Sequence, residues 1–515
     1  MLFFLLFLIF ITLFLAYIYK SFIESYKTWD QLSILNVKPK IPCGNFTNMV
    51  INKIHFGIEC RNLYEKLKSS TIGFAGIYLF KQPCLFVVNP ECAKLILAKD
   101  FNTFMNRGVY YNPKDDPLSG NIFFHENQEW KALRQRLSFA FTSGKMKMMF
   151  NTLANVGNKL VEHINNSNTI LNANEIDIKD LMARFTIDVI SSCIFGIESN
   201  CISEPKSEFR YYGKKVMTFS PLHNTAVGVA STFREPFRKI GFRVFDKEST
   251  NFFYNLVKET IQMRKDKNIF RNDLMQILMS MMEINDSTKQ SSITKSPEED
   301  IGDGKILNLN DVAANAFMFF FAGYDTSSTT LSVALYYLAL NPDIQEQARL
   351  EIKNVIGSNE NLTYENISEL HLVERIVSET LRIFPPIATL HRSANKSYTL
   401  PNGQFIKEGT QVVIPVLGFH HDPEIYPHPE IFNPDRFKDE ERQKRHAYSF
   451  IPFGEGNRIC IGLRLASMQV KVGLISILSN FKLSVCDKTD IPLVIDFSQV
   501  TYTPLNVMLK LSKLD

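Results

Sequence analysis

The sequence lacks the features that mark several common protein classes. Its eight cysteines are scattered, with no pair in a Cys-x-x-Cys spacing, which argues against a zinc site and a disulfide framework. This cysteine usage fits a catalytic domain in a reducing compartment. The net charge of +4 is small for 515 residues and gives no reason to expect a nucleic-acid partner. No internal repeat is visible, and the hydrophobic fraction of 45% is ample for a large core.

The N-terminal segment, in contrast, has no charge at all. Residues Met1 to Tyr19 are almost all Leu, Phe and Ile, and a helix of this length spans about 30 Å, the thickness of the hydrocarbon core of a bilayer. A cleaved secretory signal would need a basic start, a shorter apolar core and a small-residue cleavage site, and none is evident. The sequence predicts a transmembrane signal-anchor at residues 1–19 and a linker at residues 20–45. The mixed charges after the anchor do not set its orientation.

Near the C-terminal end, a single cysteine lies in a favourable frame. Cys460 is surrounded by glycines and preceded by Arg458. Glycine permits close backbone approach because it has no Cβ, and a cation and a following helix N-terminus favour an anionic sulfur. A helix is expected after Leu465, with Cys460 at its start. The alternative is a buried free thiol, the commonest fate of a lone cysteine.

A long apolar helix is expected between a cap at Asn310-Asp311 and residues 341–342, with a length of about 45 Å. Polar residues in its middle argue against a second membrane span. Short apolar runs between residues 72 and 89 predict strands. The polar stretch from residue 285 to 305 predicts an exposed loop, and residues 423–434 predict irregular structure.

The polar interruption of this helix is the second candidate site. Asp325 stands next to Thr326, and an acid inside an apolar helix costs stability unless it is paired. One interpretation is a helix kink in which the hydroxyl bonds back to the preceding turn. The other is a proton relay, with Ala322 and Gly323 leaving room for a ligand at the helix backbone.

Two of these segments resemble motifs of the cytochrome P450 family. The cysteine frame is similar to the family's haem-binding loop, with matches at Phe453, Gly454, Gly456, Arg458, Cys460 and Gly462. In that family the cysteine thiolate is the axial ligand of haem iron and favours O–O cleavage. Residues 322–326 resemble the family's oxygen-binding motif. By that match Thr326 would hydrogen-bond the oxygen and Asp325 would help to deliver protons.

The resemblance also implies which residues hold the cofactor, haem b (iron protoporphyrin IX), whose metal ligand would be Cys460. Its propionates need cations, and arginine suits them through its two-pronged donor geometry. Trp130 and Arg134 match the family's Trp-x-x-x-Arg, Arg392 lies where members place another propionate partner, and Arg458 is in the cysteine loop. Phe453, which opens that loop, belongs to the same cofactor-binding set. Seen singly, each arginine would more often be a solvated surface charge.

A structural triad is implied in the same way. Glu379 and Arg382 share one helix face, and an exposed pair of this kind contributes only about 0–1 kcal/mol. In the family the matching residues, with a second arginine here at Arg436, form a buried triad that braces the core. The resemblance therefore implies a structural role for this triad.

The fold implied by the resemblance is mainly α with a small β region, the cytochrome P450 fold with an N-terminal transmembrane helix and a catalytic domain at residues 46–515. The motif after Phe321 looks most like animal microsomal members, insect detoxification enzymes among them. The implied function is a haem-thiolate monooxygenase that inserts one oxygen atom from O₂ into a lipophilic substrate. The implied place is the endoplasmic reticulum membrane, with the catalytic domain in the cytoplasm.

The implied electron donor is NADPH-cytochrome P450 reductase, with cytochrome b5 as a further candidate partner. Two basic stretches are candidates for its docking surface: Lys131, Arg134, Arg136, Lys145 and Lys147, and Arg442, Lys444, Arg445 and His446. Two solvated faces are an equally good interpretation.

The expected substrate contacts are Met318, Phe321, Ala322 and residues 387–390, although each of these is individually more typical of a core. Two further functions stay open. A P450-like isomerase or dehydratase would not need the Asp325–Thr326 pair, and a non-catalytic haem or ligand-binding protein would not need the relay, the triad and the anchor together.

Overall fold

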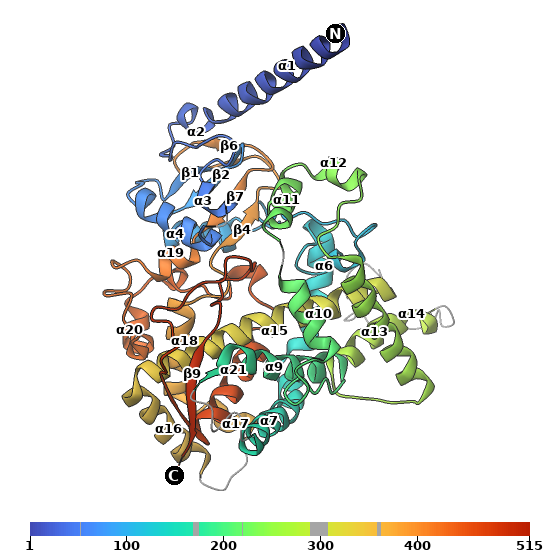
Figure 1. Cartoon of the computed structure of the whole chain (residues 1–515), viewed down its shortest axis with the longest axis vertical. Helices are drawn as coiled ribbons and strands as arrows, with labels where there is room; N and C mark the ends of the chain where they lie inside the picture. The colour runs from blue at the N-terminus through green and yellow to red at the C-terminus, as the bar shows by residue number, and fades with distance from the viewer. Residues whose placement is uncertain (52, 168–174, 219, 289–306, 358–361, 515) are drawn as a thin grey trace.

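The computed structural model describes residues 1–51, 53–167, 175–218, 220–288, 307–357 and 362–514. Helices dominate it (Figure 1). The longer ones are α1 (Leu2–Ser25), α4 (Phe56–Leu67), α6 (Asn127–Ser138), α7 (Ser143–Asn166), α9 (Ile178–Ile190), α10 (Glu208–Met217), α11 (Pro221–Thr232), α13 (Lys247–Asp266), α14 (Leu274–Thr288), α15 (Leu309–Leu340), α16 (Pro342–Ile356), α18 (His371–Ile383) and α21 (Leu463–Leu478). The short ones are α2 (Thr28–Gln31), α3 (Thr47–Val50), α5 (Pro90–Lys94), α12 (Arg234–Lys239), α17 (Tyr364–Ile367), α19 (Val416–His420) and α20 (Asp439–Gln443).

The largest sheet has the strand order β1-β2-β7-β4. β1 (Phe74–Leu79) and β2 (Gln82–Val87) are the strands predicted from the apolar runs at residues 72–89, and they pair antiparallel. β7 (Gln411–Ile414) pairs parallel with β2, and β4 (Leu390–Ser393) pairs antiparallel with β7. A second sheet joins β3 (Ile176–Asp177), β9 (Met508–Lys513) and β8 (Phe481–Ser484), and β5 (Tyr398–Thr399) pairs with β6 (Phe405–Ile406). The predicted mainly α fold with a small β region is thus confirmed.

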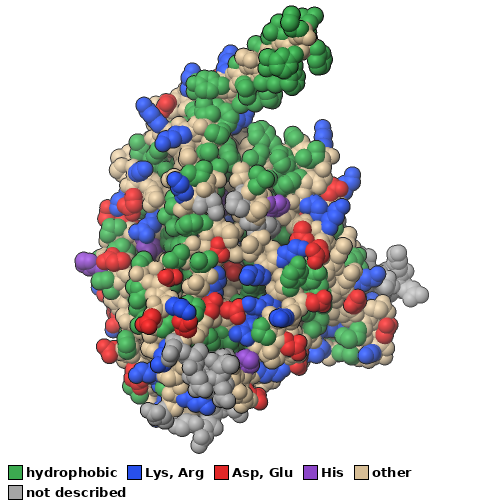
Figure 2. Space-filling model, viewed as in Figure 1, with side chains coloured by type: hydrophobic (Ala, Val, Ile, Leu, Met, Phe, Trp, Pro, Cys, Tyr) green, Lys and Arg blue, Asp and Glu red, His purple; other side chains and the backbone are tan. Residues whose placement is uncertain are grey.

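The N-terminal helix projects from the body and presents hydrophobic side chains along its length (Figures 1 and 2). Within the described residues, one segment is long and apolar enough to cross a membrane, Leu2–Gln31, and none of its most apolar part is buried. α1 extends beyond the predicted end at Tyr19, to Ser25.

The segment predicted as a linker, residues 20–45, packs in part onto the large sheet. Trp29 is buried, and its indole N–H donates to the Ile77 carbonyl at 3.0 Å. A Cβ at Gly76 would lie only 2.3 Å from the Trp29 ring, so that strand position needs a glycine. The body therefore begins well before residue 46, because an aromatic anchor inside the segment packs against β1.

The central helix α15 crosses the body and packs on α9 and α21 (Figure 1). Its N-cap is Asn308, which forms a capping box with Asp311, rather than the predicted Asn310-Asp311. The predicted loop at 285–305 is helical up to residue 288, where α14 ends, and its remainder lies outside the described residues. The irregular stretch at 423–434 is confirmed, with a 3-10 turn from Pro434 to Phe437.

Candidate active site

The cysteine loop runs from the end of a buried segment into α21. Cys460 N–H donates to the Phe453 carbonyl at 3.0 Å, which closes the loop, and Gly462 is the N-cap of α21. Gly456 has a φ of +72°, and a Cβ there would lie 2.0 Å from the Leu97 carbonyl oxygen. Only glycine fits this position. The predicted placement of Cys460 at the start of a helix is confirmed.

The Cys460 thiol is accessible at its surface although protein surrounds the residue. Burial raises its pKa, while the Gly462 N–H and the charges of Arg134 and Arg107 act in the opposite direction. Arg458, the cation expected beside the sulfur, is not among these charges, and its guanidinium donates instead to the His125 carbonyl. A metal cation bonded to the sulfur would favour the thiolate that the protein alone does not.

The predicted arginines gather in one buried cluster. Arg392, on β4, and Arg458 are almost fully buried, with exposed fractions of 2% and 3%. Arg458 donates to the His125 carbonyl at 2.7 Å, and its guanidinium lies 4.1 Å from the centroid of the Trp130 ring. Trp130 is buried, and Arg134, also on α6, is half-buried. Burial, together with the repelling charges of Arg107 and Arg392, lowers the pKa of Arg458 to about 7.

The cluster includes one arginine that the sequence did not indicate. Arg107 donates to the Phe123 carbonyl at 2.9 Å and lies 4.2 Å from the centroid of the Phe123 ring. Burial and then the charge of Arg134 lower its pKa to about 10. Arg107 matches no motif, and no sequence signal separates it from an ordinary loop arginine.

The buried arginines leave donor atoms without acceptors. Among the described residues, Arg392 Nε and Arg458 Nε and Nη1 have no hydrogen-bond partner. Buried unpaired guanidinium groups are costly, and a group carrying two carboxylates would satisfy them bidentately. The arginine cluster and the accessible Cys460 fit a haem, which has both an iron and propionates.

The middle of α15 is the other accessible region. Most of this helix is buried, but Ala322 is exposed, and Gly323 and Thr326 are partly so. A Cβ at Gly323 would lie 2.6 Å from Ile190 Cδ1 on α9, so this glycine also makes room for packing between the two helices. Ala322 supplies most of the open surface.

The two candidate relay residues do not contact each other. Thr326 Oγ1 donates to the Ala322 carbonyl at 2.7 Å, which is the back-bonding of the kink interpretation. Asp325 is buried and accepts a hydrogen bond of 2.5 Å from Thr501. Burial raises the pKa of Asp325, opposed by the Thr501 hydrogen bond and the charge of Lys179. Thr501 lies in a region where the sequence showed no motif.

Some of the expected substrate-contacting side chains are exposed, and others are buried. Ile387 has an exposed fraction of 38%, and Phe321 is half-buried. Met318 and Ala388 are buried, and a Cβ at Gly57 would lie 2.3 Å from the Ala388 Cβ. Ala388 therefore packs against α4, so its expected role in contacting substrate is wrong.

The predicted triad is present and buried. Arg382 donates to both carboxylate oxygens of Glu379, at 2.7 and 2.8 Å, and neither side chain is accessible. Arg436 Nε lies 3.4 Å from Glu379 Oε1. This geometry excludes the exposed-pair interpretation.

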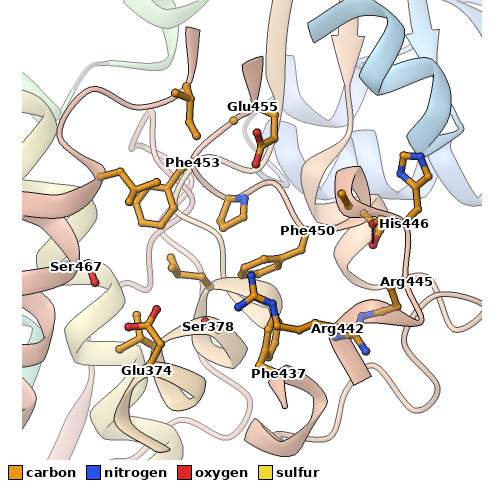
Figure 3. A pocket seen from close by; sticks show the side chains of 18 of the residues that line it. Glu374, Ser378, Phe437, Arg442, Arg445, His446, Phe450, Phe453, Glu455 and Ser467 are labelled. Atoms are coloured by element: carbon orange, nitrogen blue, oxygen red, sulfur yellow. Dashed lines mark hydrogen bonds between the residues drawn. The ribbon is translucent and has the colours of Figure 1, made fainter. Parts of the chain in front are cut away.

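A cavity of about 610 Å³ lies behind the cysteine loop, between α18, α20 and α21. Phe450, Phe437 and Arg442 lie together on one side, with Phe453 across from them (Figure 3). Cys460 does not line this cavity, although Ile459, the residue before it, does. Phe453 contributes its carbonyl to Cys460 N–H and its ring to this cavity.

Comparisons with known proteins agree with this geometry. A family model described as Cytochrome P450 matches residues 41–511. Probable cytochrome P450 6a13 of Drosophila melanogaster is 41% identical over 91% of this chain and 90% of its own length. Cytochrome P450 6a2 of the same fly is 37% identical over 98% and 96%, and cytochrome P450 6A1 of Musca domestica is 36% identical over 93% and 92%.

These matches cover nearly the whole chain and confirm the resemblance to insect members. They carry the general chemistry of the family: an oxidoreductase that uses haem b, O₂, an organic substrate and a redox partner. The chain belongs to the cytochrome P450 family and is a P450 monooxygenase.

Proposed function

We propose that Cys460 would bind the haem iron through its thiolate and that Arg107, Arg134, Arg392 and Arg458 would hold the haem propionates. The observation that supports this proposal is the buried arginine cluster, whose unpaired donor atoms need an anion. Trp130 supports Arg458 by cation–π contact. The bound haem supplies the oxygen-activating chemistry, and the chain supplies orientation and protons.

Asp325 and Thr326 have different roles in the proposed proton delivery. Asp325 is a buried carboxyl, and that burial raises its pKa and so favours the protonated form, from which it can release a proton. The Thr326 hydroxyl is accessible and can rotate from the Ala322 carbonyl toward the open surface. Since the two side chains do not touch, proton transfer between them needs a water or a rotation of Thr326.

The proposed electron donor is NADPH-cytochrome P450 reductase, with cytochrome b5 as a further partner. The two basic stretches flank the cysteine loop: Arg464 at the start of α21 contacts the Phe141 carbonyl between α6 and α7, and Arg442 lines the cavity behind the loop. Several of these cations already have partners within the chain, among them Lys147, Lys444 and His446. Lys131 and Arg442 have none among the described residues, so they are the cations best placed to receive an acidic protein.

The proposed location is the endoplasmic reticulum membrane, with α1 as the anchor and the body in the cytoplasm. The accessible side chains near the site, Ala322 and Ile387, are apolar. They fit a lipophilic substrate, either a foreign compound or an endogenous lipid or hormone.

One set of variants tests the ligation. The reduced, CO-bound protein should show the red-shifted absorption band characteristic of the P450 family, and Cys460→Ala should abolish it. Cys486→Ala, a half-buried cysteine next to β8, is the matched control and should keep it. A Cys460→Ala protein that retained the band would overturn the assignment.

A second set tests the electron donor. Lys131→Glu with Arg442→Glu should slow reductase-driven NADPH consumption because electrostatic attraction mainly raises the association rate. Lys482→Glu on β8 is the control. Unchanged turnover in the double variant would exclude this docking surface.

A further inference from the structure

Two adjacent histidines at the end of α19 have opposite hydrogen-bonding roles. His420 is fully buried, and its Nε2 accepts from the backbone N–H of Ile451 at 3.1 Å. His421 Nε2 lies 2.7 Å from the Ile383 carbonyl at the end of α18. A carbonyl only accepts, so His421 donates there, whereas the proton of the neutral His420 ring must be on Nδ1. The His420 ring thus bonds to the segment that leads to the cysteine, and the His421 ring bonds to the end of α18.

His420 is also joined to the buried triad. Arg382 Nη1 donates to the His420 carbonyl at 2.9 Å, and the same guanidinium is bound to Glu379. The His420 ring stacks on Phe450, with centroids 5.3 Å apart and planes at 27°. His420 therefore connects α18 to the beginning of the cysteine segment. Its backbone carbonyl bonds to Arg382 of α18, and its ring contacts Phe450 and Ile451.

Ile451 continues this connection toward Cys460. Its side chain is fully buried, and its carbonyl accepts from Gly454 N–H at 3.0 Å. Two residues further along, the Phe453 carbonyl accepts from Cys460 N–H at 3.0 Å. The loop from residue 451 to 460 is thus closed by its own backbone, and its first residue is fixed by the His420 ring.

We propose that His420 is a positioning residue for Cys460, acting as a neutral acceptor that fixes the base of the cysteine loop and with it the sulfur. This inference rests on the proposed ligation of haem iron by Cys460. Burial, with the charge of Arg382 among the further causes, lowers the pKa of His420 to about 3. The ring therefore remains neutral, and Nε2 remains an acceptor, throughout the range in which the enzyme is assayed.

Two variants with amide side chains test whether the acceptor at position 420 must extend as far as the Ile451 N–H. In His420→Gln the side-chain oxygen extends about as far as imidazole Nε2, so it can accept from Ile451. In His420→Asn the oxygen is one methylene shorter and leaves that buried N–H unpaired. His421→Asn is the matched control, since it removes a hydrogen bond of a neighbouring histidine without touching the cysteine loop.

The experiment uses the full chain loaded with haem, reduced and exposed to CO. For His420→Asn we expect the ratio of thiolate-ligated to non-ligated protein, measured from the red-shifted band, to fall about tenfold, the scale of one lost buried hydrogen bond. His420→Gln and His421→Asn should keep the wild-type ratio. The reduction potential of the iron should shift only in His420→Asn.

Several results would overturn the proposal. Equal ratios in the Asn and Gln variants at position 420 would show that the hydrogen bond does not position the sulfur. Fast amide exchange at Ile451 in the wild type would show the same without any variant, even if His420→Asn failed to fold. A wild-type protein with no red-shifted band would instead refute the ligation by Cys460 itself, so the two failures are distinguishable.

Discussion

The arginine cluster and the polar interruption of α15 are both buried polar groups beside the same candidate site, yet they differ in their partners. In α15, Thr326 donates to Ala322 and Asp325 accepts from Thr501. In the cluster, Arg392 and Arg458 keep donor atoms without acceptors among the described residues. Unsatisfied buried polar groups in a native fold call for a missing partner. The cluster therefore points to a bound anion, whereas Asp325 and Thr326 of α15 have partners within the chain, although the neighbouring Ser327 Oγ has none among the described residues.

The buried triad supplies a third case, a cation whose partner is inside the protein. Arg382 is as buried as Arg392, but Glu379 neutralises it. The comparison shows that burial alone does not identify a cofactor site. The informative observation is a buried charge that the chain does not neutralise.

Glu379→Gln should have the largest effect on stability. It leaves Arg382 buried without a countercharge, so we expect a loss of about 3–5 kcal/mol in the free energy of unfolding. The loss should be the same with and without haem, because this pair lies within the chain. Denaturant unfolding of both forms measures it, and a loss confined to the haem-loaded form would contradict the structural role.

Arg392→Leu combined with Arg458→Leu should stabilise the haem-free protein but weaken haem binding. Without haem, removing unpaired buried charges should stabilise the protein, by about 1–4 kcal/mol by analogy with replaced buried ion pairs. With haem, the same change should weaken cofactor retention. Arg264→Leu is the control, because Arg264 is buried but paired with Asp273, and it should destabilise both forms. Haem titration measures the loss of cofactor binding, and thermal unfolding of the haem-free protein measures the gain in stability.

Acid should destabilise the protein partly through His391, which neighbours Arg392. Burial and the charge of Arg392 lower the pKa of His391 to about 4, from 6.5. Between these values the unfolded chain binds a proton that the folded chain does not, so stability falls as the pH drops from 6.5 to about 4. The slope from this group is at most about 1.4 kcal/mol per pH unit. His391→Gln should flatten the curve of unfolding free energy against pH, and an unchanged slope would exclude the contribution.

Thr326→Val should change stability least, by less than about 1 kcal/mol, because its lost hydrogen bond is local and partly exposed. It should nevertheless lower the share of NADPH electrons that reach product. Thr330→Val is the control, since Thr330 makes the same bond to the carbonyl one turn before it but is buried. If both variants keep full coupling, measured as product formed per NADPH, Thr326 has no part in the relay.

Several parts of the site followed from local sequence. The frame of glycines around Cys460, the Glu379–Arg382 spacing and the apolar run of α15 each depend on neighbours a few residues away, and each was found in the structure. Arg107, Lys179 and Thr501 could not be predicted, because what brings them to the site is packing between segments distant in the chain. Ala388 was misassigned for the same reason, because its neighbour Gly57 belongs to α4.

The sequence by itself determined the family, the cysteine in its loop and the mainly helical fold, since these depend on residue type and short spacing. The tertiary structure alone decided which buried charges have partners, and that Asp325 and Thr326 turn away from each other. It also decided that His420, rather than His421, holds the cysteine loop. Two adjacent residues of one type can be told apart only by what the fold places against each ring.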